Sequence, residues 1–423
     1  MIDDIHTLFK RYREHEANFI WMLLKRLSTA TITFIILFIA ARLLYPNEFG
    51  QFSYLIALVS FLVIFGEFGL SSSVSKHVAE YNIRQKEKTN PIILSSLTIS
   101  FVLSLAVSII FLFFMKYSYA KYFDYSIYLV PLVFLISLVN ILEGAYRGLK
   151  KFKKLAIFSI MSGLIVIPST FFLINNYGII GAITVQIFYY LLFFLLLMKH
   201  IGVNGSFDLK MAKTVFGYAI IIGFASLAYF LYTRVDILIL EYFGYVVEIG
   251  YYEILNRIFN FLFLPFALLG QVIAPYVTEL MTNKKYNKII KYTVNLRYFL
   301  LVGIGVSLIT YFILPIIIKI ILPRYFSDAF LIILTVLLVL LPFKIMGVIL
   351  TQGFVIPTGF AKIASVLTLG GGVINIIFDI IFINWLGFIG VFYATLLVHS
   401  FVIILTYVFY YKNIKDLMEC DFC

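Results

Sequence analysis

Several ionisable residues interrupt long apolar runs in this chain, and the richest group flanks a turn near Tyr245: Arg234, Asp236, Glu253 and Arg257. The two arginines lie 11 and 12 residues from Tyr245, so on two antiparallel helices they reach similar depth. Glu253 and Arg257 are also i, i+4 neighbours on one helical face. Two interpretations stay open. The group forms ion pairs that hold a hairpin together, or some of its members face an aqueous cavity.

A second polar group follows in the last third of the chain. Asn375 and Asp379 are one helical turn apart, and Thr395 follows with Val391 one turn before it. Together with Asp236, these residues offer carboxylate, amide and hydroxyl oxygens, the hard ligands that suit a small cation. Burial of Asp379 without a cation or a proton would be prohibitively costly. The sequence therefore predicts one ion site that includes Asp236, Asn375, Asp379 and Thr395.

Other polar residues support weaker hypotheses. Arg42 either snorkels to a membrane surface or faces a cavity, and Glu67 and Glu143 either relay protons or pair with nearby cations. Cys420 and Cys423 are the only cysteines, too few for a zinc site or a disulfide framework. No Ser-His-Asp arrangement, metal-hydrolase motif or P-loop is present, so we predict that the chain is not an enzyme.

The composition is that of an integral membrane protein. Of 423 residues, 62% are hydrophobic and 13% are charged, with a mean hydropathy of +1.03. A soluble domain has roughly 45–50% apolar and about 25% charged residues, so a soluble enzyme is excluded. The net charge of +12 falls in short clusters between apolar runs and forms no continuous basic patch, which argues against nucleic acid as a partner.

Twelve segments are apolar and long enough to cross a membrane as helices, since each crossing needs about 20 apolar residues. The predicted spans are 27–45, 51–74, 91–115, 127–147, 155–175, 179–199, 214–240, 249–275, 297–318, 328–350, 362–384 and 387–411. Unbroken apolar runs exclude the alternating strands of a membrane barrel. The predicted fold is therefore an all-α bundle of twelve transmembrane helices.

The basic residues indicate the orientation of these spans. With both termini in the cytoplasm, 25 of the 33 Lys and Arg residues fall on the cytoplasmic side, 5 on the outer side and 3 within spans. Such an asymmetry is the usual mark of the cytoplasmic face. One missed or extra span would scramble this alternation, which favours a count of twelve.

The chain also repeats itself. Glu48-Phe49-Gly50 matches Glu248-Ile249-Gly250, and Gly178-x-x-Gly181 matches Gly387-x-x-Gly390. Chance similarity between apolar segments is the alternative. A true repeat gives two halves of six spans in the same orientation, as in transporters that bind substrate between two lobes. The predicted divisions are a cytoplasmic segment 1–26, an N-lobe 27–200, a linker 201–213, a C-lobe 214–411 and a cytoplasmic tail 412–423.

In order along the chain, these motifs resemble the polysaccharide-export (Wzx-like) branch of the MATE-like (MOP) flippase superfamily. The resemblance rests on Pro46-x-Glu48-Phe49-Gly50, Gly66-x-x-Gly69-Leu70, Tyr232-x-Arg234-x-Asp236, Gly250-Tyr251-Tyr252, and Asn375 ahead of Gly387-x-x-Gly390. It covers nearly the whole chain. It implies translocation of lipid-linked oligosaccharides across the cytoplasmic membrane by alternating access.

The lipid II flippases of the same superfamily are similar in one further respect. The resemblance implies a sodium site made of Asp236, Asn375, Asp379, Thr395 and the backbone carbonyl of Val391. It also implies that Arg257 lines the cavity. Those flippases have a substrate-binding arginine in their first span, whereas residues 27–41 of this chain contain no charge. This difference favours a polyprenyl-linked glycan other than the peptidoglycan precursor.

We therefore expect a monomeric flippase of the cell membrane that moves a polyprenyl-(pyro)phosphate oligosaccharide from the cytoplasmic to the outer leaflet. The expected phosphate-binding residues are, in order of preference, Arg257, Arg234 and Arg42. Sodium or a proton is the expected coupling ion, with no other cofactor. Membrane lipid, glycosyltransferases and a glycan polymerase are the expected partners. The alternatives are a MATE-type cation-coupled exporter of small organic molecules and a non-transporting scaffold for glycan polymerases.

Overall fold

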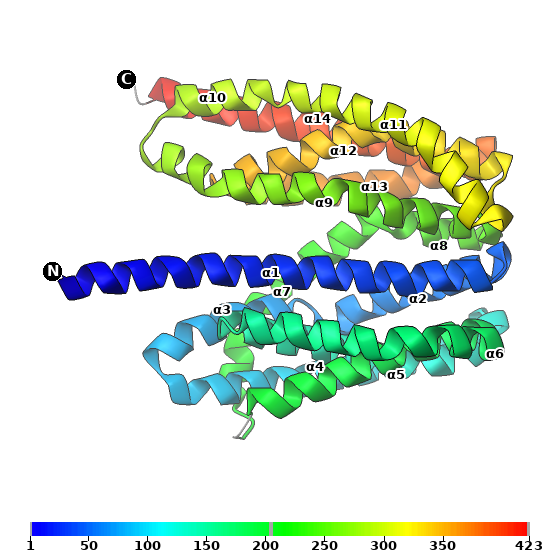
Figure 1. The fold of residues 1–423 in the computed structure, drawn as a ribbon, viewed down its shortest axis with the longest axis horizontal. Coiled ribbons are helices and arrows are strands. Elements are labelled where there is room, and N and C mark those ends of the chain that lie inside the picture. Colours follow the sequence, from blue (N-terminus) through cyan, green and yellow to red (C-terminus); the bar gives the residue numbers. More distant parts are fainter. Residues whose placement is uncertain (1, 203–205, 421–423) are drawn as a thin grey trace. The chain divides into compact units, whose positions relative to one another are not determined.

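A computed structural model describes residues 2–202 and 206–420, and the regular elements in these ranges are all helical. The prediction for the terminal cysteine pair is outside this description, because Cys423 is not among the described residues. Figure 1 shows the chain as a set of long helices joined by short turns. The all-α class predicted from composition is therefore confirmed.

The helices have the following bounds. They are α1 (Ile2–Leu43), α2 (Pro46–Glu67), α3 (Leu70–Arg84), η1 (Lys86–Lys88), α4 (Thr89–Ser118), η2 (Ala120–Tyr122), α5 (Phe123–Gly148), α6 (Phe152–Ile201), α7 (Leu209–Thr233), α8 (Val235–Tyr242), α9 (Val246–Thr282), α10 (Tyr286–Asn295), α11 (Arg297–Ile321), η3 (Pro323–Tyr325), α12 (Asp328–Leu350), the π-helix η4 (Thr351–Val355), α13 (Ala361–Leu386) and α14 (Phe388–Cys420).

Eleven helices in the described ranges are long and apolar enough to cross a membrane, one fewer than the predicted spans. The difference lies in α6, whose 50 residues would extend about 75 Å, more than twice the roughly 30 Å hydrocarbon layer. Gly178 interrupts α6 with a non-helical φ of 53° and ψ of −127°. The interruption falls between the predicted spans 155–175 and 179–199.

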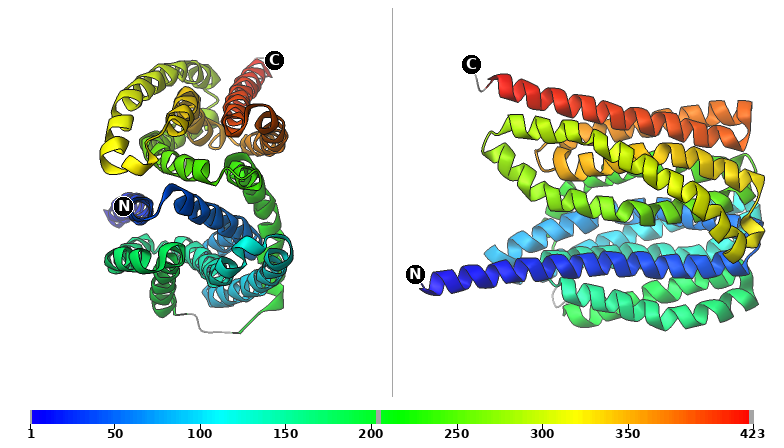
Figure 2. Two further views of the ribbon diagram at one scale, coloured as in Figure 1. Left: turned by 90° about the vertical axis from the view of Figure 1, so that its right-hand side faces the viewer. Right: turned by 45° about the horizontal axis from the view of Figure 1, so that its top comes forward.

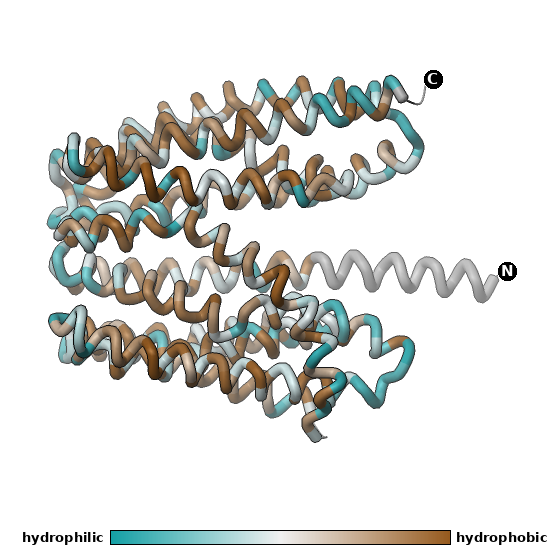
Figure 3. The backbone as a smooth tube through the Cα atoms, turned by 180° about the vertical axis from the view of Figure 1, so that it is seen from behind, coloured by the Kyte–Doolittle hydropathy of each residue, from teal (hydrophilic) through white to brown (hydrophobic). Residues whose placement is uncertain are grey.

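Two other predicted spans are broken within their length. The span predicted at 51–74 is wrong as one helix, because α2 ends at Glu67 and α3 begins at Leu70 after Gly69, which adopts a left-handed φ of 79°. The span predicted at 214–240 is also two helices, α7 and α8, which meet at Arg234. Along the helices apolar residues dominate, while polar residues gather at many of the turns (Figure 3).

The chain forms two compact units. Unit 1 comprises residues 1–44 and 55–227, and unit 2 comprises 45–54 and 228–423. These units differ from the predicted lobes in two places, because residues 45–54 belong to unit 2 and most of α7 belongs to unit 1. In unit 1, α6 packs against α1 and α5, and α5 packs against α3 and α4. Each unit is a bundle of roughly aligned helices (Figure 2).

Unit 2 is organised around α12, which packs against α9, α11 and α14. At one end of the unit, α2 and α9 begin in direct backbone contact through the two glycines of the repeated motif. A methyl group on Gly50 would overlap the carbonyl oxygen of Val246, and one on Gly250 would lie 2.9 Å from the carbonyl oxygen of Pro46. The repeated Glu-x-Gly sequences thus meet each other, which explains why both positions require glycine.

Candidate functional site

The break between α7 and α8 positions the first two site residues. Arg234 is the N-cap of α8, with a non-helical φ of −139°, and Asp236 lies in the first turn. A carboxylate is favoured there because the unpaired N–H groups at a helix N-terminus carry partial positive charge. Asp236 is 1% exposed, so the break turns a carboxylate into the interior of unit 2.

Helix α9 places Glu253 between two arginines. Arg234 donates from one terminal nitrogen to Glu253 Oε2 at 2.7 Å, and Arg257 donates from Nε to Glu253 Oε1 at 2.7 Å. The Glu253 side chain is 3% exposed and each arginine is 25% exposed. The sequence left open two ion pairs or a cavity. The structure instead gives one carboxylate that is shared by both arginines, while Asp236 pairs with neither.

This arrangement has one negative and two positive charges. Glu253 occupies one nitrogen of each guanidinium, and each arginine can donate through five N–H groups. No further side-chain partner of Arg234 or Arg257 occurs in the part of the chain that the structure describes. The partly exposed guanidinium groups therefore keep donors and a net positive charge for an anion, for which arginine has the matching planar geometry.

The second group of predicted residues meets around Asp236. Asn375 on α13 donates from Nδ2 to Asp236 Oδ1 at 2.8 Å and to Asp379 Oδ2 at 3.0 Å. The hydroxyl of Thr395 on α14 lies 3.0 Å from Asp236 Oδ2 and 3.0 Å from the carbonyl oxygen of Val391. All five residues are at most 1% exposed. We name this group the oxygen cluster.

The oxygen cluster fits a small cation. Asn375 Oδ1 and Asp379 Oδ1 are buried and have no hydrogen-bond partner. No Lys or Arg nitrogen lies within ion-pairing distance of Asp236 or Asp379 among the described residues. Lys344 on α12 interacts electrostatically with Asp236 but forms no ion pair with it, so two buried carboxylates face a single positive charge, and this excess of negative charge is unfavourable. Carboxylate, amide, hydroxyl and carbonyl oxygens are the donors of hard cations rather than of zinc or copper.

Tyr252 joins the two groups and was not predicted as a site residue. Its hydroxyl donates to Asp236 Oδ2 at 3.1 Å, and the next residue is Glu253. The Tyr252 ring packs edge-to-face on Phe392 of α14, with centroids 5.2 Å apart. In the sequence analysis, Tyr252 appeared only within the Gly250-Tyr251-Tyr252 motif of the family resemblance. No spacing rule connects it with a carboxylate on a different helix.

The remaining predicted residues lie elsewhere. Arg42 is exposed in the last turn of α1, which belongs to unit 1, whereas Arg234 and Arg257 belong to unit 2. Glu143 forms ion pairs with Lys25 at 2.7 Å and Arg147 at 3.7 Å, which favours the pairing interpretation for that carboxylate. Glu67 has one buried carboxylate oxygen without a hydrogen-bond partner.

The fold matches that of solved membrane transporters. An inward-facing multidrug resistance transporter of the MATE family, within the MOP superfamily, has a TM-score of 0.72 at 14% identity, covering 94% of this chain and 99% of its own. Lipid II flippase MurJ in an inward closed conformation has a TM-score of 0.73 at 20% identity, covering 92% and 87%. A MOP transporter from Pyrococcus furiosus, described as having a binding pocket of reversed polarity, has a TM-score of 0.62 at 16% identity, covering 94% of each chain. The fold is therefore that of the MOP superfamily.

The family is defined by sequence as well. The model of the polysaccharide biosynthesis protein family matches residues 16–281, more than half of the 423 residues, and the chain belongs to this family. Comparison with curated protein sequences finds no significant match. The chain is therefore a multi-pass membrane protein of the polysaccharide biosynthesis protein family, and it has the fold of the solved MATE and MurJ transporters.

Proposed function

We propose that this protein moves a polyprenyl-(pyro)phosphate-linked oligosaccharide from the cytoplasmic to the outer leaflet of the cell membrane by cation-coupled alternating access. The observation that supports this most directly is the shared Glu253 between two partly exposed arginines. The family adds a role in polysaccharide biosynthesis, whose membrane intermediates are lipid-linked glycans.

The arginine pair provides the affinity for the phosphate. A phosphate brings at least one negative charge, and two guanidinium groups that share one carboxylate leave one positive charge for it. Glu253 holds each arginine through one nitrogen, so their other N–H groups are kept in place before the anion arrives. Arg257 is the primary phosphate ligand, because it lies within the continuous helix α9, and Arg234 is the second.

The oxygen cluster provides the coupling site. A sodium ion would be held by Asp236, Asn375, Asp379, Thr395 and the carbonyl of Val391, and when bound it would offset one of the two negative charges of the carboxylates. A proton on Asp379 is the alternative, since its free Oδ1 is one of the two oxygens without a partner. Either form removes buried charge from the place where α8, α13 and α14 meet.

The proposal also includes the finer topology. The interruption at Gly178 makes α6 two crossings, which gives twelve crossings in two six-helix lobes. The excess of basic residues on one side then puts both termini in the cytoplasm. Glycosyltransferases on that side would supply the substrate, and the protein works as a monomer with membrane lipid around it.

The test is flipping of a fluorescent polyprenyl-diphosphate oligosaccharide in proteoliposomes. We expect Arg257→Ala to abolish flipping. Arg84→Ala is the matched control, because Arg84 also pairs with an i−4 glutamate at 2.7 Å but is exposed at the end of α3. Equal activity of the two variants would refute the phosphate-binding role of Arg257.

Export of small organic molecules is the second candidate function, because the MATE multidrug transporter shares the fold. An exporter of organic cations would need an acidic binding surface, whereas Arg234, Glu253 and Arg257 together are positive. The same proteoliposomes distinguish the two functions. Proton- or sodium-driven efflux of an organic cation without glycolipid flipping would replace the flippase proposal.

A further inference from the structure

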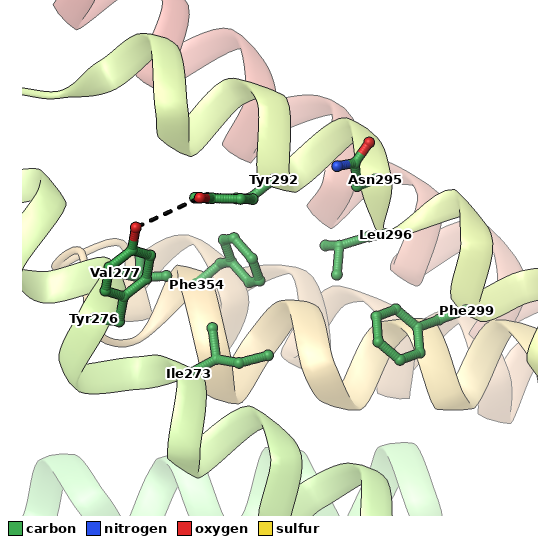
Figure 4. A pocket seen from close by; sticks show the side chains of 8 residues that line it. All are labelled: Ile273, Tyr276, Val277, Tyr292, Asn295, Leu296, Phe299 and Phe354. Carbon is green, nitrogen blue, oxygen red and sulfur yellow. Dashed lines mark hydrogen bonds between the residues drawn. The ribbon is translucent and has the colours of Figure 1, made fainter.

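An apolar groove lies at the end of unit 2 where α9, α10, α11 and η4 meet, and neither proposed site uses it (Figure 4). Its volume is about 360 Å³. The lining residues are Ile273, Tyr276, Val277, Tyr292, Asn295, Leu296, Phe299 and Phe354. Val277, Leu296 and Phe354 are almost fully buried, whereas Tyr276 and Tyr292 are 46% and 37% exposed. The groove thus has an apolar floor and an accessible rim.

The rim carries polar groups where a membrane surface would lie. The hydroxyls of Tyr276 and Tyr292 meet at 3.4 Å across the groove, as the dashed line in Figure 4 shows. Tyr298, the neighbour of the groove-lining Phe299 in the chain, is 53% exposed. Exposed tyrosines next to long apolar helices are typical of the boundary between hydrocarbon and headgroups. The groove therefore opens at the level where a lipid headgroup meets its acyl chain.

Helix α10 adds positive charge beside this rim. It buries Tyr286, Ile289 and Thr293 and exposes Lys288 and Lys291. Lys288 lies one turn before Tyr292, and Lys291 one turn before Asn295, so both lysines share a face with groove-lining residues. Neither lysine has an ion-pair partner in the described part of the chain. A short helix with an apolar face and a lysine-rich face is suited to lie in the membrane interface.

We infer that this groove binds an anionic phospholipid of the cytoplasmic leaflet, with an acyl chain against Val277, Leu296 and Phe354 and the phosphate beside Lys288 and Lys291. Charge complementarity favours this occupant, since the groove is apolar and the two lysines, Lys288 and Lys291, outnumber the exposed Glu279, which interacts electrostatically with the rim residue Tyr276. The cytoplasmic leaflet carries the anionic lipids that such lysines attract. The inference needs the proposed orientation but not the proposed transport activity.

The groove is separate from the site that we propose for the phosphate of the glycolipid substrate. Ile273 lies 16 residues beyond Arg257 on α9, about 24 Å along a helix. A phosphate at Arg257 is therefore too far away to interact with Lys288 as well. The groove is a site for a resident lipid beside the transport machinery.

The test is native mass spectrometry of the full-length protein in detergent, titrated with phosphatidylglycerol and, separately, with phosphatidylcholine of the same acyl chains. We expect tighter binding of phosphatidylglycerol. Lys288→Gln/Lys291→Gln should weaken it about thirty-fold, or about 2 kcal/mol, because each basic residue near an anionic headgroup contributes about 1 kcal/mol. Lys210→Gln/Lys213→Gln is the matched control, with the same charge change and the same spacing on exposed positions of α7.

A second variant tests the groove itself. Ile273→Trp fills it while keeping both lysines, and we expect it to weaken phosphatidylglycerol binding with no loss of thermal stability. Equal affinity for both lipids, or equal effects of the two lysine pairs, would overturn the inference. Tighter binding of a polyprenyl phosphate than of phosphatidylglycerol would also overturn it and assign the groove to the transported lipid.

Discussion

The oxygen cluster makes a quantitative prediction for Asp379→Asn. The same Asn375 nitrogen donates to Asp236 at 2.8 Å and to Asp379 at 3.0 Å, so one oxygen of each carboxylate lies within about 6 Å of the other. When both carboxylates are ionised, they repel each other by about 3 kcal/mol at an effective dielectric constant of about 20. Asparagine keeps the shape and removes one charge. We expect the sodium-free variant to be more stable than the wild type by up to this amount.

Sodium should stabilise the wild type but not the variant. A ligand at a hundred times its Kd stabilises a folded protein by about 2.7 kcal/mol, so the wild type should melt at a higher temperature in sodium chloride than in potassium chloride. Asp379→Asn should lose this difference. Asp416→Asn, an exposed position on α14, should keep it. If Asp379→Asn keeps the full sodium response, or melts lower than the wild type without sodium, the cluster does not bind a cation.

Three further predictions concern the neighbouring contacts. Glu253→Gln should lower the stability by about 2–3 kcal/mol in detergent unfolding, less than a fully buried pair because each arginine is 25% exposed, whereas Glu80→Gln should change it by less than about 1 kcal/mol. Tyr252→Phe should lower the stability of the sodium-free protein by about 1–3 kcal/mol, since it removes a donor to a buried carboxylate; an unchanged stability would contradict the contact. Gly50→Ala should lower the melting temperature because the methyl group overlaps a carbonyl oxygen of α9, whereas Gly305→Ala, which meets open space, should leave it unchanged or raise it.

The sequence was sufficient for the fold class and for the members of the oxygen cluster. Apolar runs of the right length have few alternatives to membrane helices, so the class follows from hydropathy. Asn375 and Asp379 could be paired because residues one turn apart share a helical face. Asp236 and Thr395 were grouped with them as oxygen ligands of one ion, and the resemblance added the carbonyl of Val391. The structure brings all five residues together.

Local breaks and partners across helices could not be predicted in the same way. The helix interruptions at Gly178 and Arg234 lie inside apolar runs, so hydropathy does not reveal them. Their similar distances from the turn at Tyr245 predicted that Arg234 and Arg257 lie at similar depth. These distances could not show which carboxylate pairs with each arginine. That choice depends on the rotation of α8 about its axis, which packing fixes and spacing does not. The role of Tyr252 was missed for the same reason.

The two sites of unit 2 are physically joined at two places, and this explains how an ion could affect an anion without touching it. Arg234 and Asp236 are two residues apart at the start of α8, and Tyr252 and Glu253 are adjacent on α9. Each helix thus contributes one residue to the oxygen cluster and one to the arginine pair. A shift of α8 against α9 that breaks the Tyr252–Asp236 hydrogen bond must also strain the Arg234–Glu253 ion pair. In the proposed mechanism, a cation that favours one arrangement of these helices would change the geometry offered to a phosphate, and this would provide the differential affinity that coupling requires.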